Sequence, residues 1–211
     1  MSSFVSVEMA TETFRQGRFV IIADDEGREN EGDLVIAAEF CDAAAVNFMI
    51  REGRGLVCCS LDHRIIERLG LELMVPPEEN KSGFGTGFTV SVEAATGVTT
   101  GISAPDRART IEVLIDPASG PNDLARPGHM FPLRAHPGGL LARGGQTEAS
   151  VELAKLAGLR PGAVICEIIN DDGTMARRPD LETFSKKHDI PITTTEALRR
   201  HILALNAQAA E

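Results

Sequence analysis

Short apolar runs rich in β-branched and aromatic residues alternate along the chain with segments that repeat apolar positions at helical spacing. The apolar runs are short enough to be strands, and they occupy residues 19–22, 34–36, 55–58, 88–92 and 163–166. The helical spacing predicts helices over residues 5–16, 43–52, 62–69, 104–115, 148–157, 180–188 and 194–206. Intermixed strands and helices favour a layered α/β or α+β domain, and the order of the segments leaves the sheet topology open.

Boundary residues support several of these helices. Ser103 and Thr147 stand where the N-caps of two helices are expected, and Gly158 follows the second helix as a C-terminal stop would. No repeat, low-complexity stretch or Pro/Gly/Ser-rich linker interrupts the pattern. We therefore predict a single domain over residues 1–211.

The composition narrows the class of protein. Hydrophobic residues make up 43% and charged residues 25% of the 211 residues, which is typical of a globular chain with a real core. The formal net charge of -10 argues against a nucleic-acid partner, because that attraction depends on clustered Lys and Arg. No stretch approaches the ~20 apolar residues that span a bilayer, and the N-terminus lacks a secretion leader. We expect a cytoplasmic protein without a membrane partner.

Cysteine and aromatic residues exclude some kinds of site. Cys41, Cys58, Cys59 and Cys166 lack the spacing of a zinc site, and we expect them to be reduced. Tyr and Trp are absent, which leaves Phe as the only aromatic residue for stacking on a base or sugar. Ligand recognition should therefore rely on charge and hydrogen bonds.

The stretch from Asp24 to Asp33 places six carboxylates and one arginine between two apolar strand candidates. Crowded carboxylates repel one another unless a cation or protonation relieves them, and hard oxygen ligands suit magnesium or manganese better than zinc. In an extended backbone Glu29, Glu31 and Asp33 would project on one side. The alternative is a solvated acidic loop that joins two strands.

A second stretch runs from Arg143 to Glu148 into an apolar-periodic helix. Gly144 and Gly145 allow a backbone to approach an anion closely, and the free N–H groups of a helix start favour phosphate. Arg143 would complete such a phosphate cradle. The alternative is an ordinary tight turn with Thr147 as N-cap.

Two further residues are candidate acid–base groups. Glu167 lies inside an apolar strand candidate, so it either faces solvent or is partly buried with a raised pKa. His129 lies on an extended path set by neighbouring Pro and Gly residues, and a lone histidine is either an acid–base group or structural. Residues 83–87 are rich in glycine but precede a strand, so we interpret them as a flexible loop.

Five blocks of the sequence together resemble the signature blocks of the 3,4-dihydroxy-2-butanone 4-phosphate synthases, in matching order and spacing. They are residues 24–35, 85–108, 126–135, 143–158 and 166–177. The resemblance implies an α+β fold, a three-layer α/β/α domain with a mixed sheet, that forms a homodimer with active sites near the interface. It also implies a carbon–carbon lyase of riboflavin biosynthesis that converts D-ribulose 5-phosphate to L-3,4-dihydroxybutan-2-one 4-phosphate and formate.

The resemblance further implies a cofactor and a set of site residues. The cofactor is Mg²⁺ or Mn²⁺, with two ions per site held by Glu29 and by position 146. The implied catalytic residues are His129, Glu167, Asp33 and Cys58. The implied substrate-binding residues are Arg28, Glu29, Asp33, Arg143, Gly144, Gly145, Gln146, Thr147 and Glu167, and Asp24 and Glu31 fall in the same blocks.

Position 146 departs from the family pattern, which has histidine where this chain has glutamine. The amide oxygen of Gln146 can replace an imidazole nitrogen as a magnesium ligand, but glutamine cannot transfer a proton. Two hypotheses follow: an active lyase with reduced turnover, or a catalytically weak sugar-phosphate-binding homologue with a regulatory or assembly role. The resemblance does not extend to the GTP cyclohydrolase II domain of bifunctional relatives, so we expect a monofunctional protein.

Overall fold

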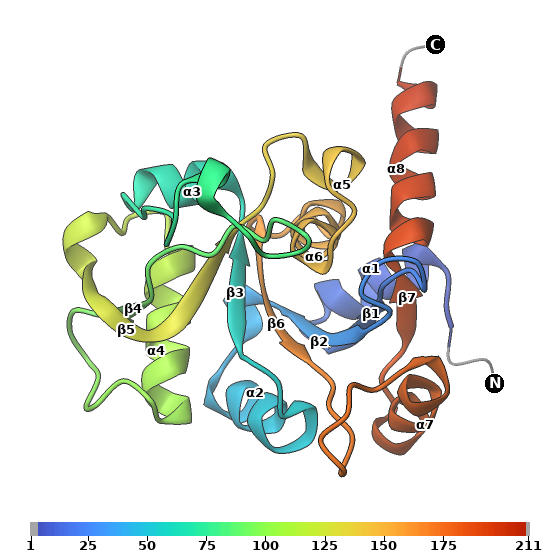
Figure 1. Ribbon diagram of the computed structural model, residues 1–211, viewed down its shortest axis with the longest axis horizontal. Helices are drawn as coiled ribbons and strands as arrows, with labels where there is room; N and C mark the ends of the chain where they lie inside the picture. Colours follow the sequence, from blue (N-terminus) through green and yellow to red (C-terminus); the bar gives the residue numbers. More distant parts are fainter. Residues whose placement is uncertain (1–3, 210–211) are drawn as a thin grey trace.

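A mixed seven-stranded sheet forms the centre of the computed structural model, which describes residues 4–209 (Figure 1). The strand order is β4-β5-β3-β6-β2-β1-β7, with β1/β7 and β3/β5 parallel and the other neighbours antiparallel. The strands are β1 (Val20–Ala23), β2 (Gly32–Ala37), β3 (Cys58–Leu61), β4 (Val92–Ala94), β5 (Leu124–Arg134), β6 (Gly162–Glu167) and β7 (Ile192–Thr194).

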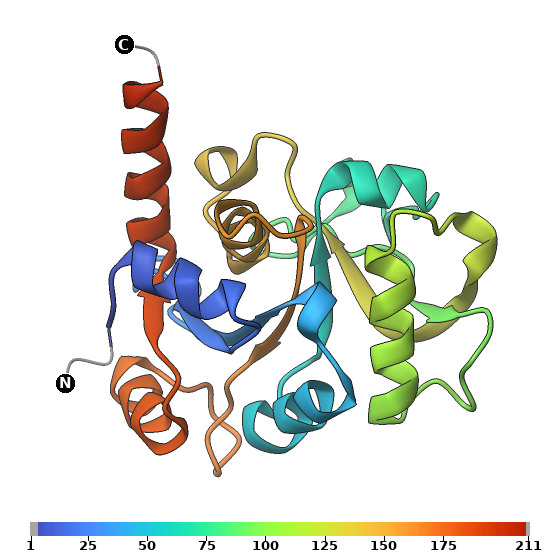
Figure 2. The same ribbon diagram turned by 180° about the vertical axis from the view of Figure 1, so that it is seen from behind.

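Helices cover both faces of this sheet. One hydrophobic cluster joins the sheet to α1 (Val7–Arg15), α5 (Gly139–Ala142), α6 (Gln146–Leu156) and α8 (Thr195–Gln208). The other joins it to α2 (Ala43–Phe48), α3 (His63–Arg68), α4 (Ala104–Ile115) and α7 (Arg178–His188). Figure 2 shows α1 beside α8, which continues past the rest of the molecule. The predicted three-layer α+β fold with a mixed sheet is confirmed.

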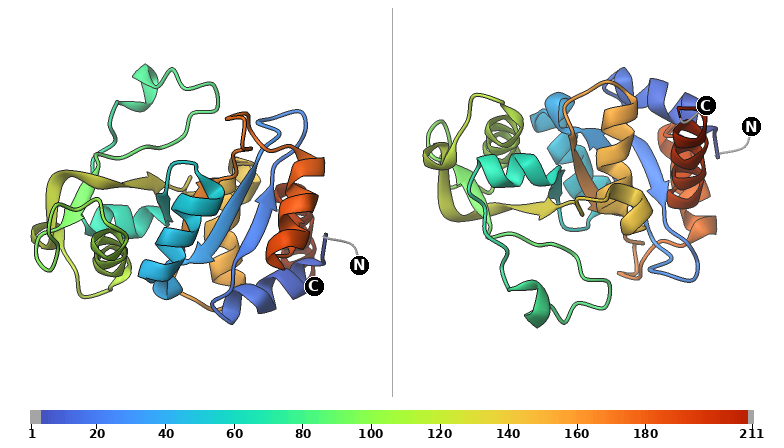
Figure 3. Two further views of the ribbon diagram at one scale, coloured as in Figure 1. Left: turned by 90° about the horizontal axis from the view of Figure 1, so that it is seen from below. Right: turned by 90° about the horizontal axis from the view of Figure 1, so that it is seen from above.

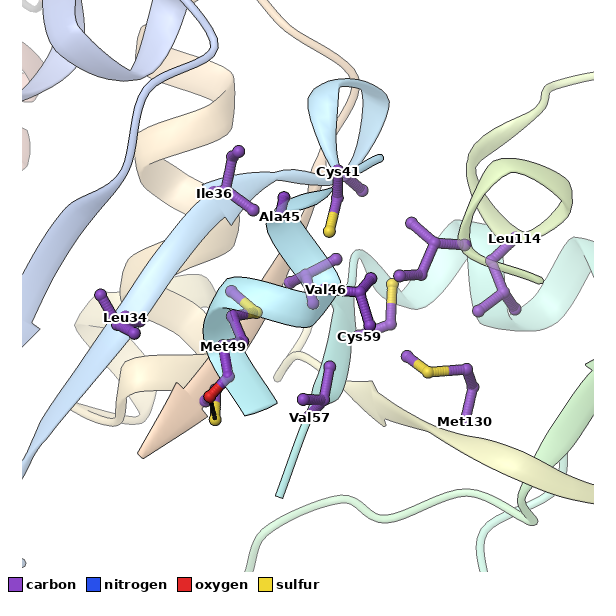
Figure 4. Packing of buried hydrophobic residues seen from close by; sticks show 14 of the residues in the cluster. Leu34, Ile36, Cys41, Ala45, Val46, Met49, Val57, Cys59, Leu114 and Met130 are labelled. Atoms are coloured by element: carbon purple, nitrogen blue, oxygen red, sulfur yellow. Dashed lines mark hydrogen bonds between the residues drawn. The ribbon is translucent and has the colours of Figure 1, made fainter. Parts of the chain in front are cut away.

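The central strands are buried on both faces, so their side chains divide between the two clusters by alternation. In β2, Leu34 and Ile36 pack against α2 (Figure 4). Val35 and Ala37 belong to the cluster on the α6 side. Burial of a side chain the size of Leu34, Val35 or Ile36 stabilises the fold by about 1.5–3 kcal/mol. The four cysteines are free thiols in this interior, and Cys166 Sγ lies 3.7 Å from the carbonyl oxygen of Met49.

Local capping signals predicted some boundaries well and one badly. Helix α4 has the predicted bounds, and Ser103 Oγ accepts the N–H of Asp106 at 3.2 Å. Gly158 takes the left-handed φ of 72° that ends α6. The N-cap prediction for Thr147 is wrong, because α6 begins earlier, at Gln146 after Gly145. Thr147 is buried within the first helical turn, so tertiary packing decides this boundary.

Several strands also differ from the prediction. The run at 55–58 becomes a strand only from Cys58, and the run at 88–92 forms isolated bridges before β4 begins at Val92. Strand β5 was predicted only as an extended path, because its prolines lower strand propensity. Its pairing with β3 and β4 outweighs that preference. Strand β7 and helix α5 were not predicted.

The segment between α3 and β4 makes a long excursion from the body (Figure 3). Its only helical turn is η3 (Pro77–Glu79), and Phe84 beyond it is 46% exposed. No helix within residues 4–209 combines the length and apolar character that crossing a bilayer requires.

Candidate active site

Three of the expected site residues lie on the adjacent strands β3, β6 and β2 of the sheet. Asp33 of β2 and Glu167 of β6 are directly opposite each other, and Cys58 of β3 is opposite Ile165. By alternation these three side chains share the face that packs against α6. The same alternation from Phe131 and Leu133, which pack in that cluster, places His129 of β5 on this face too.

The acidic loop between β1 and β2 folds back on itself instead of extending. Residues 26–29 form a turn, Asn30 has a left-handed φ of 54°, and the N–H of Asp24 donates to Glu31 O at 2.8 Å. The prediction that strand alternation aligns Glu29 with Glu31 and Asp33 is therefore wrong. The turn gathers these carboxylates, and only its tip is a solvated loop, since Asp24 and Asp33 are buried.

Arg28 is the centre of a network that joins this loop to α6. Its Nη1 donates to Asp24 Oδ2 at 2.7 Å and to Gln146 Oε1 at 3.0 Å, and Nη2 lies 3.0 Å from Glu29 Oε1. The Phe84 ring lies 4.7 Å from the guanidinium carbon, in a cation–π arrangement. Burial opposes the charge, but the hydrogen bond and charge of Asp24, with Glu29, outweigh it and raise the pKa of Arg28.

Arg143 forms a second network at the same helix start. Its guanidinium pairs with Glu148, donates to Thr86 Oγ1 at 2.9 Å and donates to the carbonyl oxygen of Phe84 at 3.2 Å. Glu148 is only 1% exposed, and its Oε1 accepts the N–H of His136 at 2.9 Å. These partners of Arg143 were not predicted from the sequence. Glu148 belonged to the quoted motif, but Phe84 and Thr86 lay in a segment interpreted only as a flexible loop.

The two guanidiniums converge on Gly145. A Cβ atom there would lie 2.6 Å from Arg143 Nη1 and 3.0 Å from Arg28 Nη2, whereas one on Gly144 would meet open space. Gly145 is the N-cap of α6 and supplies no side-chain cap, so the first N–H groups of the eleven-residue helix lack that partner. Two arginines beside a helix N-terminus suit a phosphate group.

Asp33 on the sheet has a strongly perturbed pKa. Burial, then the charges of Glu167 and Glu29, raise the pKa of Asp33 well above its usual range. Asp33 Oδ1 has no hydrogen-bond partner among the described residues. Glu167 is half-buried, and its Oε2 accepts the N–H of Leu56 at 2.8 Å. Burial, followed by Glu167 and Asp33, raises the pKa of Cys58 too, so its thiol stays protonated at neutral pH.

His129 lies apart from the arginine networks. Its Nδ1 is 3.0 Å from Glu93 Oε1, and its side chain is 45% exposed. Gly101 and Gly128 make room for Glu93, since a Cβ atom on either would come within 2.3 Å of its side chain. Among residues 4–209, the hydrogen bond and ion pair of His129 both go to Glu93, a partner that the sequence analysis did not identify.

The donor set around Arg28 fits a hard divalent cation. Glu29 and Gln146 each point an oxygen atom at the same guanidinium, and oxygen is the ligand atom that Mg²⁺ and Mn²⁺ prefer. In the described part of the chain no three His, Cys, Asp or Glu side chains form a ready metal cluster. A cation would therefore rest on this carboxylate, this amide oxygen and oxygens of water or substrate.

Comparison with known proteins shows which family the chain resembles. The family model for 3,4-dihydroxy-2-butanone 4-phosphate synthase matches residues 8–201. A 3,4-dihydroxy-2-butanone 4-phosphate synthase of Pseudomonas syringae pv. tomato is 55% identical over 202 residues, covering 96% of this chain and 54% of the relative. One from Cronobacter sakazakii is 51% identical over 197 residues, covering 93% of this chain and 90% of the relative.

A solved structure extends the comparison to three dimensions. A 3,4-dihydroxy-2-butanone 4-phosphate synthase in complex with two magnesium ions superposes with a TM-score of 0.90 at 41% identity, covering 94% of this chain and 97% of that one. The chain spans about half the length of several curated relatives that it matches, at 54%, 51% and 48% of theirs. From the family model, these identities and the shared fold, the chain belongs to the 3,4-dihydroxy-2-butanone 4-phosphate synthase family.

Proposed function

We propose that the protein is a carbon–carbon lyase of riboflavin biosynthesis that converts D-ribulose 5-phosphate to L-3,4-dihydroxybutan-2-one 4-phosphate and formate. The observation that carries this proposal is the convergence of Arg28 and Arg143 on Gly145, on the face of the sheet that also holds Asp33 and Glu167. The arrangement offers a phosphate cradle beside a pair of carboxyl groups. That combination suits proton transfers on a sugar phosphate.

The phosphate would bind at the start of α6. Arg143 is held by Glu148, so its charge keeps its place before substrate arrives, and Gly144 leaves open space beside it. The first N–H groups of α6, at Gln146 and Thr147, add fixed positive potential. Binding energy from the phosphate would thereby orient the reacting carbons.

Proton transfers would fall to the residues of the sheet. The reaction requires enolisation, dehydration, a carbon-skeleton shift and loss of one carbon as formate. Asp33, with its raised pKa, is suited to donate a proton, Glu167 beside it to accept one, and His129 to act from the β5 side. Cys58, as a protonated thiol, can contact substrate but is unsuited to attack as a thiolate.

Glu29 and Gln146 would hold the magnesium or manganese at this site, with two ions per site. A related structure that is a complex with two magnesium ions supports the use of such a cation. Bound there, the cation would neutralise negative charge that develops on neighbouring substrate oxygens. We also infer a single domain over residues 1–211, of which residues 1–3 and 210–211 lie outside the described part. A cytoplasmic homodimer completes the proposal, and light scattering tests its oligomeric state.

One observation favours the alternative of a weakly catalytic sugar-phosphate-binding protein. Gln146 replaces a residue that transfers protons, and its oxygen already accepts a hydrogen bond from Arg28. A protein with this change would still capture the phosphate through Arg143. Formate release separates the two functions, because binding alone produces none.

The decisive experiment measures formate from ribulose 5-phosphate with magnesium, in the presence and absence of a chelator. We expect magnesium-dependent formate from the native chain and a large loss with Glu29→Gln. Glu26→Gln is the matched control, because Glu26 is an exposed carboxylate of the same loop. Full turnover in excess chelator, or no formate under any condition, would contradict the proposed function.

A second experiment tests the phosphate cradle. Arg143→Ala should raise the KM for ribulose 5-phosphate more than it lowers kcat. The reason is that Arg143 would contact the phosphate both in the bound substrate and in the transition state, so its loss weakens both. Unphosphorylated ribulose should react poorly with the native protein. Equal turnover of the two sugars would rule out a phosphate site at α6.

A further inference from the structure

Arg28 occupies an unusual position with respect to the two residues proposed to hold metal. Its two terminal nitrogens each lie 3.0 Å from an oxygen of that set, Nη1 from Gln146 Oε1 and Nη2 from Glu29 Oε1. A single guanidinium thus joins an amide oxygen of α6 to a carboxylate of the acidic loop. Arg28 and Gln146 are 118 positions apart in the sequence, so this contact depends on the fold.

A guanidinium and a divalent cation compete for such oxygens. Magnesium requires its oxygen ligands at about 2.0–2.1 Å, with lone pairs directed at the ion. Gln146 Oε1 and Glu29 Oε1 already interact with the N–H groups of Arg28, and two positive charges a few ångströms apart repel each other strongly in a poorly solvated site. The Arg28 side chain is only 16% exposed, so water screens this repulsion weakly.

We propose that Arg28 is an internal counter-cation that competes with the divalent metal for Glu29 and Gln146. Arg28 must release these two oxygens before a metal ion can bind them, and the affinity for metal is correspondingly lowered. The inference rests on the proposed function only in naming the metal and its two ligands. It concerns binding, so it holds or fails independently of turnover.

Asp24 keeps Arg28 in the site during this exchange. Asp24 Oδ2 accepts from Nη1 at 2.7 Å, and the Asp24 side chain is fully buried. Asp24 Oδ2 also accepts the N–H of Glu29 at 3.1 Å, so the carboxylate is fixed to the loop backbone. Arg28 can therefore give up Glu29 and Gln146 without leaving its buried carboxylate partner.

Gln146 makes the competition between Arg28 and the metal independent of pH. An amide oxygen accepts from a guanidinium at any pH, and it cannot become a cation itself. An imidazole at the same position would accept through one ring nitrogen only, and only while neutral. The glutamine of this chain therefore supplies Arg28 with a permanent acceptor at the metal position.

The experiment measures Mn²⁺ binding to the full chain without substrate, by calorimetry and by the paramagnetic resonance of free Mn²⁺. Arg28→Met removes the competing charge and should tighten Mn²⁺ binding by about tenfold or more. Arg28→Lys keeps a charge and should stay within about threefold of the native affinity. Arg200→Met is the matched control, because Arg200 lines the cavity behind the same loop but its Nε pairs with Glu196 at 3.3 Å.

The pattern across the variants decides the proposal. Tightening in Arg28→Met, with little change in Arg28→Lys and Arg200→Met, supports it even if the protein releases no formate. Equal tightening in Arg28→Lys and Arg28→Met would overturn it, since loss of loop structure would then explain both. Unchanged or weaker binding in Arg28→Met, or equal tightening in Arg200→Met, would also overturn it.

Discussion

Two regions of the site are built in opposite ways. Around Arg28 and Arg143, each charge already has a protein partner of opposite sign, and the carboxylates of Asp24 and Glu148 are buried. Around His129, one half-exposed ring faces one carboxylate, that of Glu93, on β4 at the end of the sheet. The first region is set in place by the fold. The second remains open to solvent.

The difference separates preorganisation from reactivity. A group fixed by several partners can position a phosphate or a metal at little further cost in conformational entropy. A group exposed on one side can exchange protons with substrate and solvent. Mutations in the arginine region should therefore change binding and stability, and mutations at His129 should change turnover alone.

The largest expected effect comes from His129→Gln, which sharpens this contrast. We expect kcat to fall by roughly 10²–10⁴-fold, because an acid–base contribution is of that size. The melting temperature should hardly change, since the ring is 45% exposed. His63→Gln is the matched control. His63 also pairs with a carboxylate, that of Asp62, but His63 belongs to α3 and not to the proposed site. Equal losses in both variants would contradict a specific role for His129.

Gln146→His tests whether the arginine region lacks a reactive group. An imidazole there can both bind metal and transfer a proton, so we expect kcat at saturating magnesium to rise by about 10²-fold. Initial-rate measurements of formate release compare the two proteins. Robust activity in the native chain and no gain in the variant would show instead that the site has adapted to an amide oxygen.

Asp33→Asn should stabilise the fold at neutral pH. Because the pKa of Asp33 is raised in the folded state, its contribution to folding stability is fully present below about pH 3.8, the ordinary pKa of the side chain. That contribution is lost as the pH rises through the raised pKa of the folded state. At pH 7 the variant should gain about 1–3 kcal/mol in free energy of unfolding, shrinking as the pH falls towards 4. Urea denaturation at both pH values measures it, with exposed Asp25→Asn as control. A less stable variant at pH 7 would contradict the buried, unpaired state of the carboxyl group.

Phe84→Ala should have the smallest effect. A partly exposed cation–π contact stabilises by about 0.5–1 kcal/mol, so the KM for ribulose 5-phosphate should rise only about threefold. Leu141→Ala is a suitable control, since Leu141 is also a partly exposed apolar residue on the α6 side. A loss of tenfold or more in kcat would show that Phe84 does more than orient Arg28.

Local signals in the sequence explain what was predicted correctly. The start and end of α4 follow from Ser103 and from apolar spacing within twelve residues. Strand β5 depends instead on pairing with β3 and β4, and two prolines, Pro127 and Pro132, hide it from any local pattern. An element that is stabilised by residues distant in the sequence, such as β5, therefore cannot be predicted from a local pattern.

The same distinction applies to the site. The structure places Arg28, Glu29, Arg143 and Gly145 close together, whereas the sequence grouped them only through the resemblance to a family. The contact between Arg28 and Gln146 joins two motifs, and no spacing within either one predicts it. The roles assigned to these residues in catalysis and metal binding stay predictions for the experiments above.

The pairing of Asp33 with Glu167 also limits how the length of this chain can vary. Successive residues of a strand face opposite sides, so one residue inserted into or deleted from β2 would turn Asp33 towards α2 and bring Leu34 to face α6. A change of one residue in β6 would do the same to Glu167. We therefore expect functional homologues to vary in length within the excursion between α3 and β4, while β2 and β6 keep their register.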